Sequence, residues 1–228
     1  MTQPAETFVR WYLRFNGYLG VENLIVHAPV QGAVPQGAEF DVVAVRFPFS
    51  REVADFELPR HPQLETIERP GVVNVVIAEV KGGRDTSLND PWRREANDQL
   101  QLQRLKYLVR WLGFCDSEND VESVATELRR TGRSDRACAV RAVYFGARRS
   151  QQAADLEIPG ILLEDIASWI VGTRAVCWRE QGLANRSCHD QWDPLIKNVW
   201  NLADPVLPGS QEQKVRSILA IVLGRAAP

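Results

Sequence analysis

The sequence predicts an α/β fold in which helices flank a mixed central sheet. Two stretches, 40–47 and 72–80, are nearly continuous in apolar residues without a helical period, which is typical of strands covered on both faces. Amphipathic helical patterns stand before the first of these strands and after the second, so helices are available for both faces of a sheet. With 228 residues, the chain is long enough to build one large core.

Composition limits the class of protein and its location. Hydrophobic residues make up 45% of the chain and charged residues 25%, which excludes a disordered protein. The formal net charge of −2 excludes a protein that coats nucleic acid through overall basicity, so any nucleic-acid site must be a local patch. No stretch approaches the ~18 apolar residues of a membrane span. We therefore expect a cytoplasmic protein with no membrane partner.

The elements before the first apolar strand are a helix, a strand and a loop. Helical spacing of aromatic residues predicts a helix over 5–16, and Asn16-Gly17 ends it. The aromatic residues of that face are Phe8, Trp11, Tyr12 and Phe15. An extended stretch at 23–28 predicts a strand, and a cluster of Pro and Gly at 29–37 predicts a loop.

The stretch between the two apolar strands is different in character. Residues 49–70 hold three prolines and many charges, so they are too polar for a core and too long for a tight turn. We expect an insertion at one edge of the sheet.

After the second apolar strand, the longest helical pattern runs over 90–112, with proline near its start, where it is tolerated. Its apolar face consists of Leu102, Leu105, Leu108, Val109 and Leu112. A partly helical stretch at 115–137, a strand at 139–145 and a helix at 163–172 follow.

Two further helices are predicted near the C-terminus, at 194–202 and 211–223, joined by a segment rich in Pro and Gly. The predicted organisation is therefore a core over 1–175 and a helical appendage over 176–228 that packs on it. Trp178, Trp192 and Trp200 are expected on the surface, where they favour a protein partner or a homodimer formed through the C-terminal helices.

The chemistry is indicated by charged residues inside the apolar strands. Glu79 and Lys81 lie on one face of their strand, about 6.6 Å apart. Burying an ionised carboxylate costs several kcal/mol unless it is paired or binds a metal. Asp41 poses the same problem in the other strand. If the strands are neighbours, two carboxylates and one amine converge, and that set suits a hard cation open to water and phosphate.

The pattern Asp41, then 37 residues, then Glu79-Val80-Lys81 resembles the signature of the PD-(D/E)XK nucleases. The resemblance covers roughly 5–146 and implies a restriction-endonuclease-like fold. It implies that Asp41, Glu79 and the Val80 carbonyl hold Mg²⁺ or Mn²⁺, while Lys81 orients or activates the attacking water. Phe40 stands where many members have proline, and the gap is long, which the insertion at 49–70 explains.

Further residues fit the resemblance in part. Gln103 and Tyr107 match the QxxxY motif of RecB-like members, in which these two side chains border the active site. Some members, such as the archaeal Holliday-junction resolvases, add a glutamate from the first helix, and Glu6 has that position. The helical wheel, however, places Glu6 opposite the aromatic face, where it forms a surface ion pair with Arg10. Glu39 shares a strand face with Asp41 and is the better auxiliary ligand.

Residues 129–149 form a locally basic segment that suits contact with phosphates or forms an ordinary charged face. Its arginines are Arg129, Arg130, Arg133, Arg136, Arg141, Arg148 and Arg149. Cys177, Cys188 and His189 make an incomplete zinc set, so we expect ordinary thiols and no zinc.

Two functions follow from these patterns. The first is a Mg²⁺-dependent DNA phosphodiesterase. The second is a non-catalytic module of a repair or defence system that binds DNA or a protein partner, in which Asp41, Glu79 and Lys81 form a structural salt-bridge cluster and Gln103 and Tyr107 a solvated helix face. No pattern for a P-loop, a dinucleotide-binding loop or a serine-esterase elbow is present in the sequence.

Overall fold

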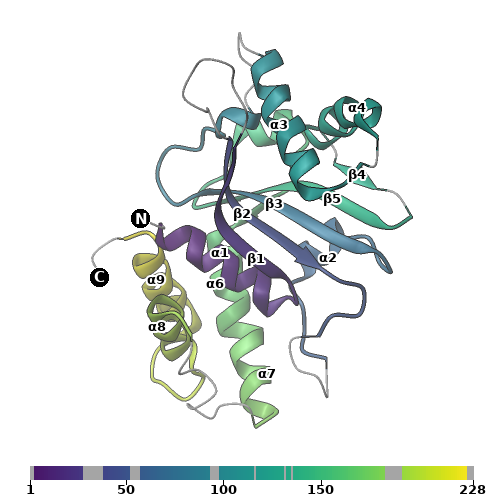
Figure 1. Ribbon diagram of the computed structural model, residues 1–228. Helices are drawn as coiled ribbons and strands as arrows, with labels where there is room; N and C mark the ends of the chain where they lie inside the picture. The colour runs from purple at the N-terminus through teal and green to yellow at the C-terminus, as the bar shows by residue number, and fades with distance from the viewer. Residues whose placement is uncertain are drawn as a thin grey trace.

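The computed structural model describes residues 3–27, 38–51, 57–92, 98–115, 117–130, 132–134, 136–182 and 192–224. In this part of the chain, helices cover both faces of a six-stranded mixed sheet (Figure 1). The predicted α/β architecture is confirmed. Two apolar cores result, one on each face of the sheet.

The sheet has the order β1-β2-β3-β5-β4, with β6 beside β5. The strands are β1 (Leu19–Val26), β2 (Ala38–Arg46), β3 (Val73–Lys81), β4 (Arg133–Ser134), β5 (Cys138–Gly146) and β6 (Gly160–Leu162). β2 pairs antiparallel with β1 and with β3, whereas β3 and β5 pair parallel. The carboxyl ends of β3 and β5 therefore lie at the same end of the sheet. The predicted loop at 29–37 lies outside the described residues.

One face of the sheet is covered by the first helix and by the C-terminal helices (Figure 1). These are α1 (Pro4–Phe15), α6 (Leu163–Trp169), the π-helical turn η2 (Ile170–Arg174), α7 (Ala175–Glu180), α8 (Pro194–Ala203) and α9 (Gln211–Val222). The predicted boundary at 175 falls inside the continuous helical run from α6 to α7. α8 and α9 share one core with α1, as Ile196, Val199 and Ile218 are fully buried in it.

The other face is covered by α3 (Asp98–Leu112), α4 (Glu118–Leu128) and α5 (Gln151–Asp155). The helix predicted over 90–112 is found as a short 3₁₀ turn, η1 (Asp90–Trp92), and α3. Its predicted apolar face is confirmed for Leu105, Leu108 and Val109, which are fully buried.

The expectation that residues 49–70 are too polar for the core is wrong for the described part of that stretch, whereas an insertion there stays a prediction. The described part contains α2 (Pro62–Ile67), and Leu58, Leu64 and Ile67 are buried in the core beneath α1. Its charges are neutralised internally, because the Glu68 carboxylate accepts hydrogen bonds from Tyr18 and Arg60. A polar sequence therefore does not mean that this stretch is exposed to solvent.

The expectation of surface tryptophans is also wrong. Trp178 and Trp200 are only 7% and 9% exposed. Together with Trp192 they pack around Trp11 and Phe15 of α1, and the ring centroids of Trp192 and Trp200 lie 5.3 Å apart. These side chains join the C-terminal helices to the core, so they do not support the predicted partner surface, and a protein partner stays a prediction.

Among the described residues, no helix is both long enough and apolar enough to cross a membrane.

Candidate active site

Asp41 and Glu79 meet where the ladder between β2 and β3 ends. The last paired positions are Val42 and Ala78. Beyond them, Asp41 Oδ2 accepts a hydrogen bond from the backbone N–H of Val80 at 2.6 Å, so a side chain takes the place of a backbone partner. The two strands thus part at the position where both carry an acid.

The local course of β2 explains why Asp41 points to this gap. In a regular strand, Phe40 and Val42 would lie on the same face. Here Phe40 packs in the core beside α3, whereas Val42 packs in the core beside α1. The faces change at Asp41, and Asn23, which lies across from it in β1, adopts a left-handed backbone with φ of 51°. Asp41 therefore belongs to neither apolar core and is directed toward β3.

Asn89, in the loop after β3, ties the acidic residues and the lysine together. Its backbone N–H donates to Glu79 Oε1 at 2.5 Å, and its side-chain amide donates to Asp41 Oδ1 at 3.0 Å. Its Oδ1 accepts a hydrogen bond from Lys81 Nζ at 2.6 Å. Lys81 Nζ also lies 2.9 Å from Glu79 Oε1. The structure brings together the three residues that strand alternation placed at one sheet edge.

Both carboxylates are deeply buried, with exposed fractions of 7% for Asp41 and 3% for Glu79. Burial raises the pKa of Asp41 above its ordinary value. Burial and then the nearby charge of Asp41 raise the pKa of Glu79 to about 7, although Lys81 acts in the opposite direction. One lysine does not compensate two buried acids, so the site favours a further positive charge.

The site opens into a cavity of about 540 Å³. Its charged lining residues are Glu6, Glu39, Asp41, Asp85, Lys81 and Arg104. Glu39 is exposed at this cavity. Four acidic side chains against two basic ones make the lining attractive to a cation and repulsive to a lone phosphate.

The prediction of a surface ion pair between Glu6 and Arg10 is wrong. Glu6 is 6% exposed and lines the cavity, and its carboxylate accepts a hydrogen bond from the backbone N–H of Gln3. Arg10 pairs with Glu22 of β1 instead. Burial and, to a lesser extent, the charge of Asp41 raise the pKa of Glu6, while the Gln3 hydrogen bond lowers it. The helical wheel failed because α1 is buried on almost every side near its start, so Glu6 is covered by neighbouring elements and lines the cavity.

Gln103 and Tyr107 are half-buried on α3, and neither is among the described residues that line the cavity. Tyr107 packs against the core beneath α3 and α4, with the guanidinium of Arg110 6.0 Å from its ring centroid. Arg104 is the α3 side chain that reaches the cavity lining. A role of Gln103 and Tyr107 beside Asp41 and Glu79 stays a prediction.

The predicted arginine segment is divided in space. Arg129 is buried and Arg133 pairs with Glu127, both before the amino end of β5. Arg148 and Arg149 are exposed after the carboxyl end of β5. Eight steps along a strand span about 26 Å. Of these four arginines, only Arg148 and Arg149 therefore lie at the same end of the sheet as Lys81.

Asn89 and Arg104 are the site residues that sequence reasoning missed. Asn89 precedes Asp90-Pro91, which signals a helix start but not contact with residues 10 and 48 positions earlier. Arg104 stands next to Gln103, yet one helical step turns it to a different direction. Neither position can be predicted from the sequence, because both depend on how the loop and the helix pack on the sheet.

A divalent cation fits the donors present at this site. Asp41 and Glu79 supply carboxylate oxygens with raised pKa values, and the Val80 carbonyl faces the same side of β3 as its N–H, toward Asp41. Among the described residues, no group of three or more His, Cys, Asp or Glu is arranged to hold a metal. Cys188 and His189 lie outside the described residues.

No family model, curated protein or solved structure matches this chain.

Proposed function

We propose that this protein is a Mg²⁺-dependent phosphodiesterase of the PD-(D/E)XK type that cleaves DNA. One observation carries the proposal: two buried carboxylates and one lysine meet at a parted strand end beside an open, acidic cavity. This arrangement has uncompensated negative charge in the place where a metal-dependent phosphodiesterase needs it.

Asp41, Glu79 and the Val80 carbonyl would hold Mg²⁺ or Mn²⁺, both of which prefer oxygen ligands. When bound, the ion polarises the phosphate and lowers the pKa of a coordinated water. Its two positive charges would offset the excess of acidic over basic side chains in the cavity lining, so a phosphodiester would be repelled less.

Lys81 has a separate task. Its amine is held by the Glu79 carboxylate and by Asn89 Oδ1, so its position is fixed before substrate arrives. A fixed ammonium orients the attacking water through hydrogen bonds and stabilises the charge that develops on the phosphate oxygens. Metal binding and water positioning are therefore assigned to different side chains. Substitutions at single residues can test the two roles separately.

The test is Mg²⁺-dependent nicking of single-stranded, duplex and branched DNA. Asp41→Ala should lose both cleavage and metal-induced stabilisation, whereas Lys81→Met should lose cleavage and retain stabilisation by metal. Lys106→Met is the matched control, because Lys106 lies on α3 in an ion pair with exposed Glu122; it should cleave as the wild type does. Equal cleavage by all variants would indicate a contaminating nuclease and contradict the proposal.

A second candidate is supported by Asn89. This residue hydrogen-bonds to Asp41, Glu79 and Lys81 at once, so each of the three has a hydrogen-bond partner within the protein without any ligand. A non-catalytic module that binds DNA or a protein partner would have this arrangement. In that case the wild type cleaves none of the three DNA substrates, and both substitutions change only stability.

A further inference from the structure

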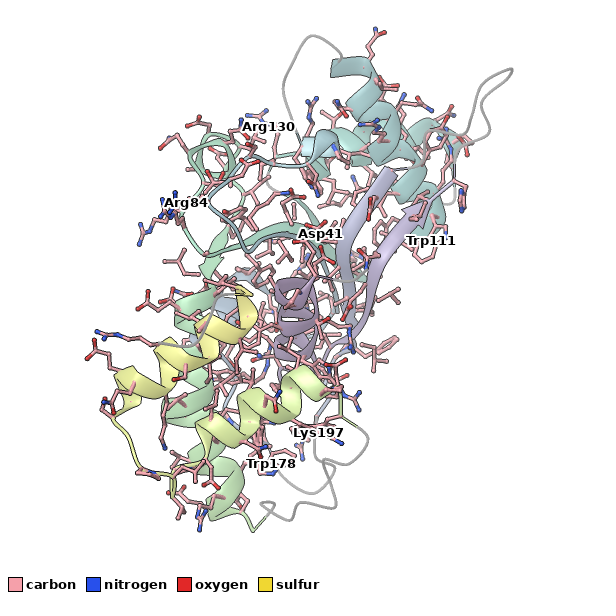
Figure 2. All side chains as sticks on the ribbon, turned by 90° about the vertical axis from the view of Figure 1, so that its left-hand side faces the viewer. Asp41, Arg84, Trp111, Arg130, Trp178 and Lys197 are labelled. Carbon is pink, nitrogen blue, oxygen red and sulfur yellow. The ribbon has the colours of Figure 1, made fainter. Side chains whose placement is uncertain are left out.

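The loops that follow β3 and β5 carry three exposed arginines at the site's end of the sheet. Arg84 lies in the first loop, and Arg148 and Arg149 lie in the second. We name these three side chains the arginine platform. Arg84 stands between Gly83 and Asp85, both of which line the cavity. Figure 2 shows Arg84 projecting outward from its loop, whereas Asp41 lies in the interior.

The two loops are fastened to each other. The backbone N–H of Ala147 donates to the Lys81 carbonyl at 2.9 Å, directly at the end of the paired strands. Farther out, Ser150 Oγ donates to the Thr86 carbonyl at 2.8 Å, and Gln152 Oε1 accepts from a backbone N–H of the first loop at 3.0 Å. The arginine platform is therefore attached to a fixed base, and its orientation relative to the cavity is set by the sheet.

The platform combines three exposed arginines at one end of the sheet, none of them paired with an acid of the described residues. Within the described residues, some exposed arginines elsewhere form ion pairs, such as Arg110 with Glu118 and Arg216 with Glu212, whereas others do not. No ion pair joins a platform arginine to a carboxylate of the described residues. Asp85 is the nearby acid in sequence, and its carboxylate accepts hydrogen bonds from Ser87. Positive charge is thus concentrated beside an acidic cavity.

We infer that the arginine platform binds the sugar–phosphate backbone of nucleic acid and delivers one phosphodiester to the cavity. Guanidinium groups bind phosphates in a bidentate manner, and a polynucleotide presents phosphates at regular intervals on both sides of the scissile one. The cavity repels phosphate until a cation is present, so affinity for the substrate must come from outside it. The inference rests on the proposed function for its choice of ligand, but it assigns affinity to residues separate from the chemistry.

The experiment measures binding of fluorescein-labelled 30-nucleotide single-stranded and 30-base-pair duplex DNA in chelator, at several salt concentrations. The variant replaces all three platform residues: Arg84→Gln, Arg148→Gln and Arg149→Gln. Its duplex affinity should fall at least about tenfold, and its plot of log K against log salt should be less steep by about 1 per arginine removed. Because these side chains are exposed, the thermal midpoint should stay unchanged.

The matched control replaces three other exposed arginines that form no ion pair within the described residues, namely Arg51→Gln, Arg130→Gln and Arg136→Gln. These follow β2, precede β4 and precede β5, away from the carboxyl ends of β3 and β5. The control should bind with the affinity and salt slope of the wild type.

Equal binding by the platform variant and the control would overturn the inference, as would absence of DNA binding by the wild type. Displacement of labelled DNA by polyglutamate as readily as by unlabelled DNA would overturn the assignment to nucleic acid in favour of an acidic protein. Cleavage is measured in parallel. If the protein cleaves DNA but the platform variant binds DNA as the wild type does, the role of the platform is rejected and the proposed nuclease function stands. If the platform variant loses binding but the wild type does not cleave, the nuclease function is rejected and the role of the platform stands.

Discussion

The backbone N–H of Asn89 donates to the Glu79 carboxylate at 2.5 Å, although ten positions of sequence separate the two residues. The chain leaves β3, turns, and returns to the strand end it came from. Protein donors therefore occupy carboxylate oxygens that a cation would also use. Binding of a cation to these oxygens should consequently change the stability of the protein.

Mg²⁺ or Mn²⁺ should raise the thermal midpoint of the protein. Asp41 and Glu79 repel each other when both are ionised, and a cation removes that repulsion. The expected stabilisation is about 2.7 kcal/mol at 100 times Kd. Differential scanning calorimetry with and without metal measures it, with Asp41→Ala as the control that should not respond. An unchanged midpoint at saturating metal would contradict the site.

Stability without metal should fall as pH rises through the range from about 4.5 to 7. The folded protein holds a proton on Glu79 up to a pKa of about 7, whereas an unfolded chain releases it near 4.5. Since the folded state binds more protons in this window, raising the pH disfavours it, by up to about 1.4 kcal/mol per pH unit.

Urea unfolding of the wild type and Glu79→Gln in chelator isolates this effect. The amide cannot ionise, so the variant should lack that part of the pH dependence and should gain stability relative to the wild type near pH 7. A difference between the two proteins that does not change with pH would show that the Glu79 pKa is ordinary.

Asn89→Ala should destabilise the metal-free protein by about 1–3 kcal/mol. The substitution removes the amide that donates to Asp41 and accepts from Lys81, and it leaves buried polar groups without that partner. Metal should recover part of the loss, because a cation satisfies the carboxylate in place of the amide. Asn198→Ala, at an exposed position of α8, is the control for chemical denaturation and should change stability little. Equal stability of the two variants would mean that the Asn89 contacts contribute nothing net.

Trp200→Ala should cost about 3–5 kcal/mol of unfolding free energy, as expected for a large side chain removed from a core. Trp111→Ala should cost less than about 1 kcal/mol, because Trp111 is 55% exposed (Figure 2). Urea midpoints of the two variants compare them directly. Similar small losses would mean that Trp200 is available to a partner, as the sequence suggested.

The central strands and the convergence of Asp41, Glu79 and Lys81 could be predicted from the sequence, because strand period and apolar runs report local burial. Glu6 could not be placed, since its burial depends on helices far along the chain that enclose α1. Asn89 was equally hidden, as its contacts depend on the path of a loop. Periodicity describes one element at a time, whereas these positions are set by how several elements pack together.

The parallel pairing of β3 with β5 has a consequence for how the protein folds. β1, β2 and β3 pair with their immediate neighbours in sequence, so the two acids are brought together by one contiguous stretch of the chain. β5 must return across a long connection before its loop can meet the loop after β3. Closing so long a connection is slow relative to hairpin formation. The acidic pair and Arg84 thus belong to one contiguous part of the chain, whereas Arg148 and Arg149 reach the same end of the sheet only through the distant pairing of β5.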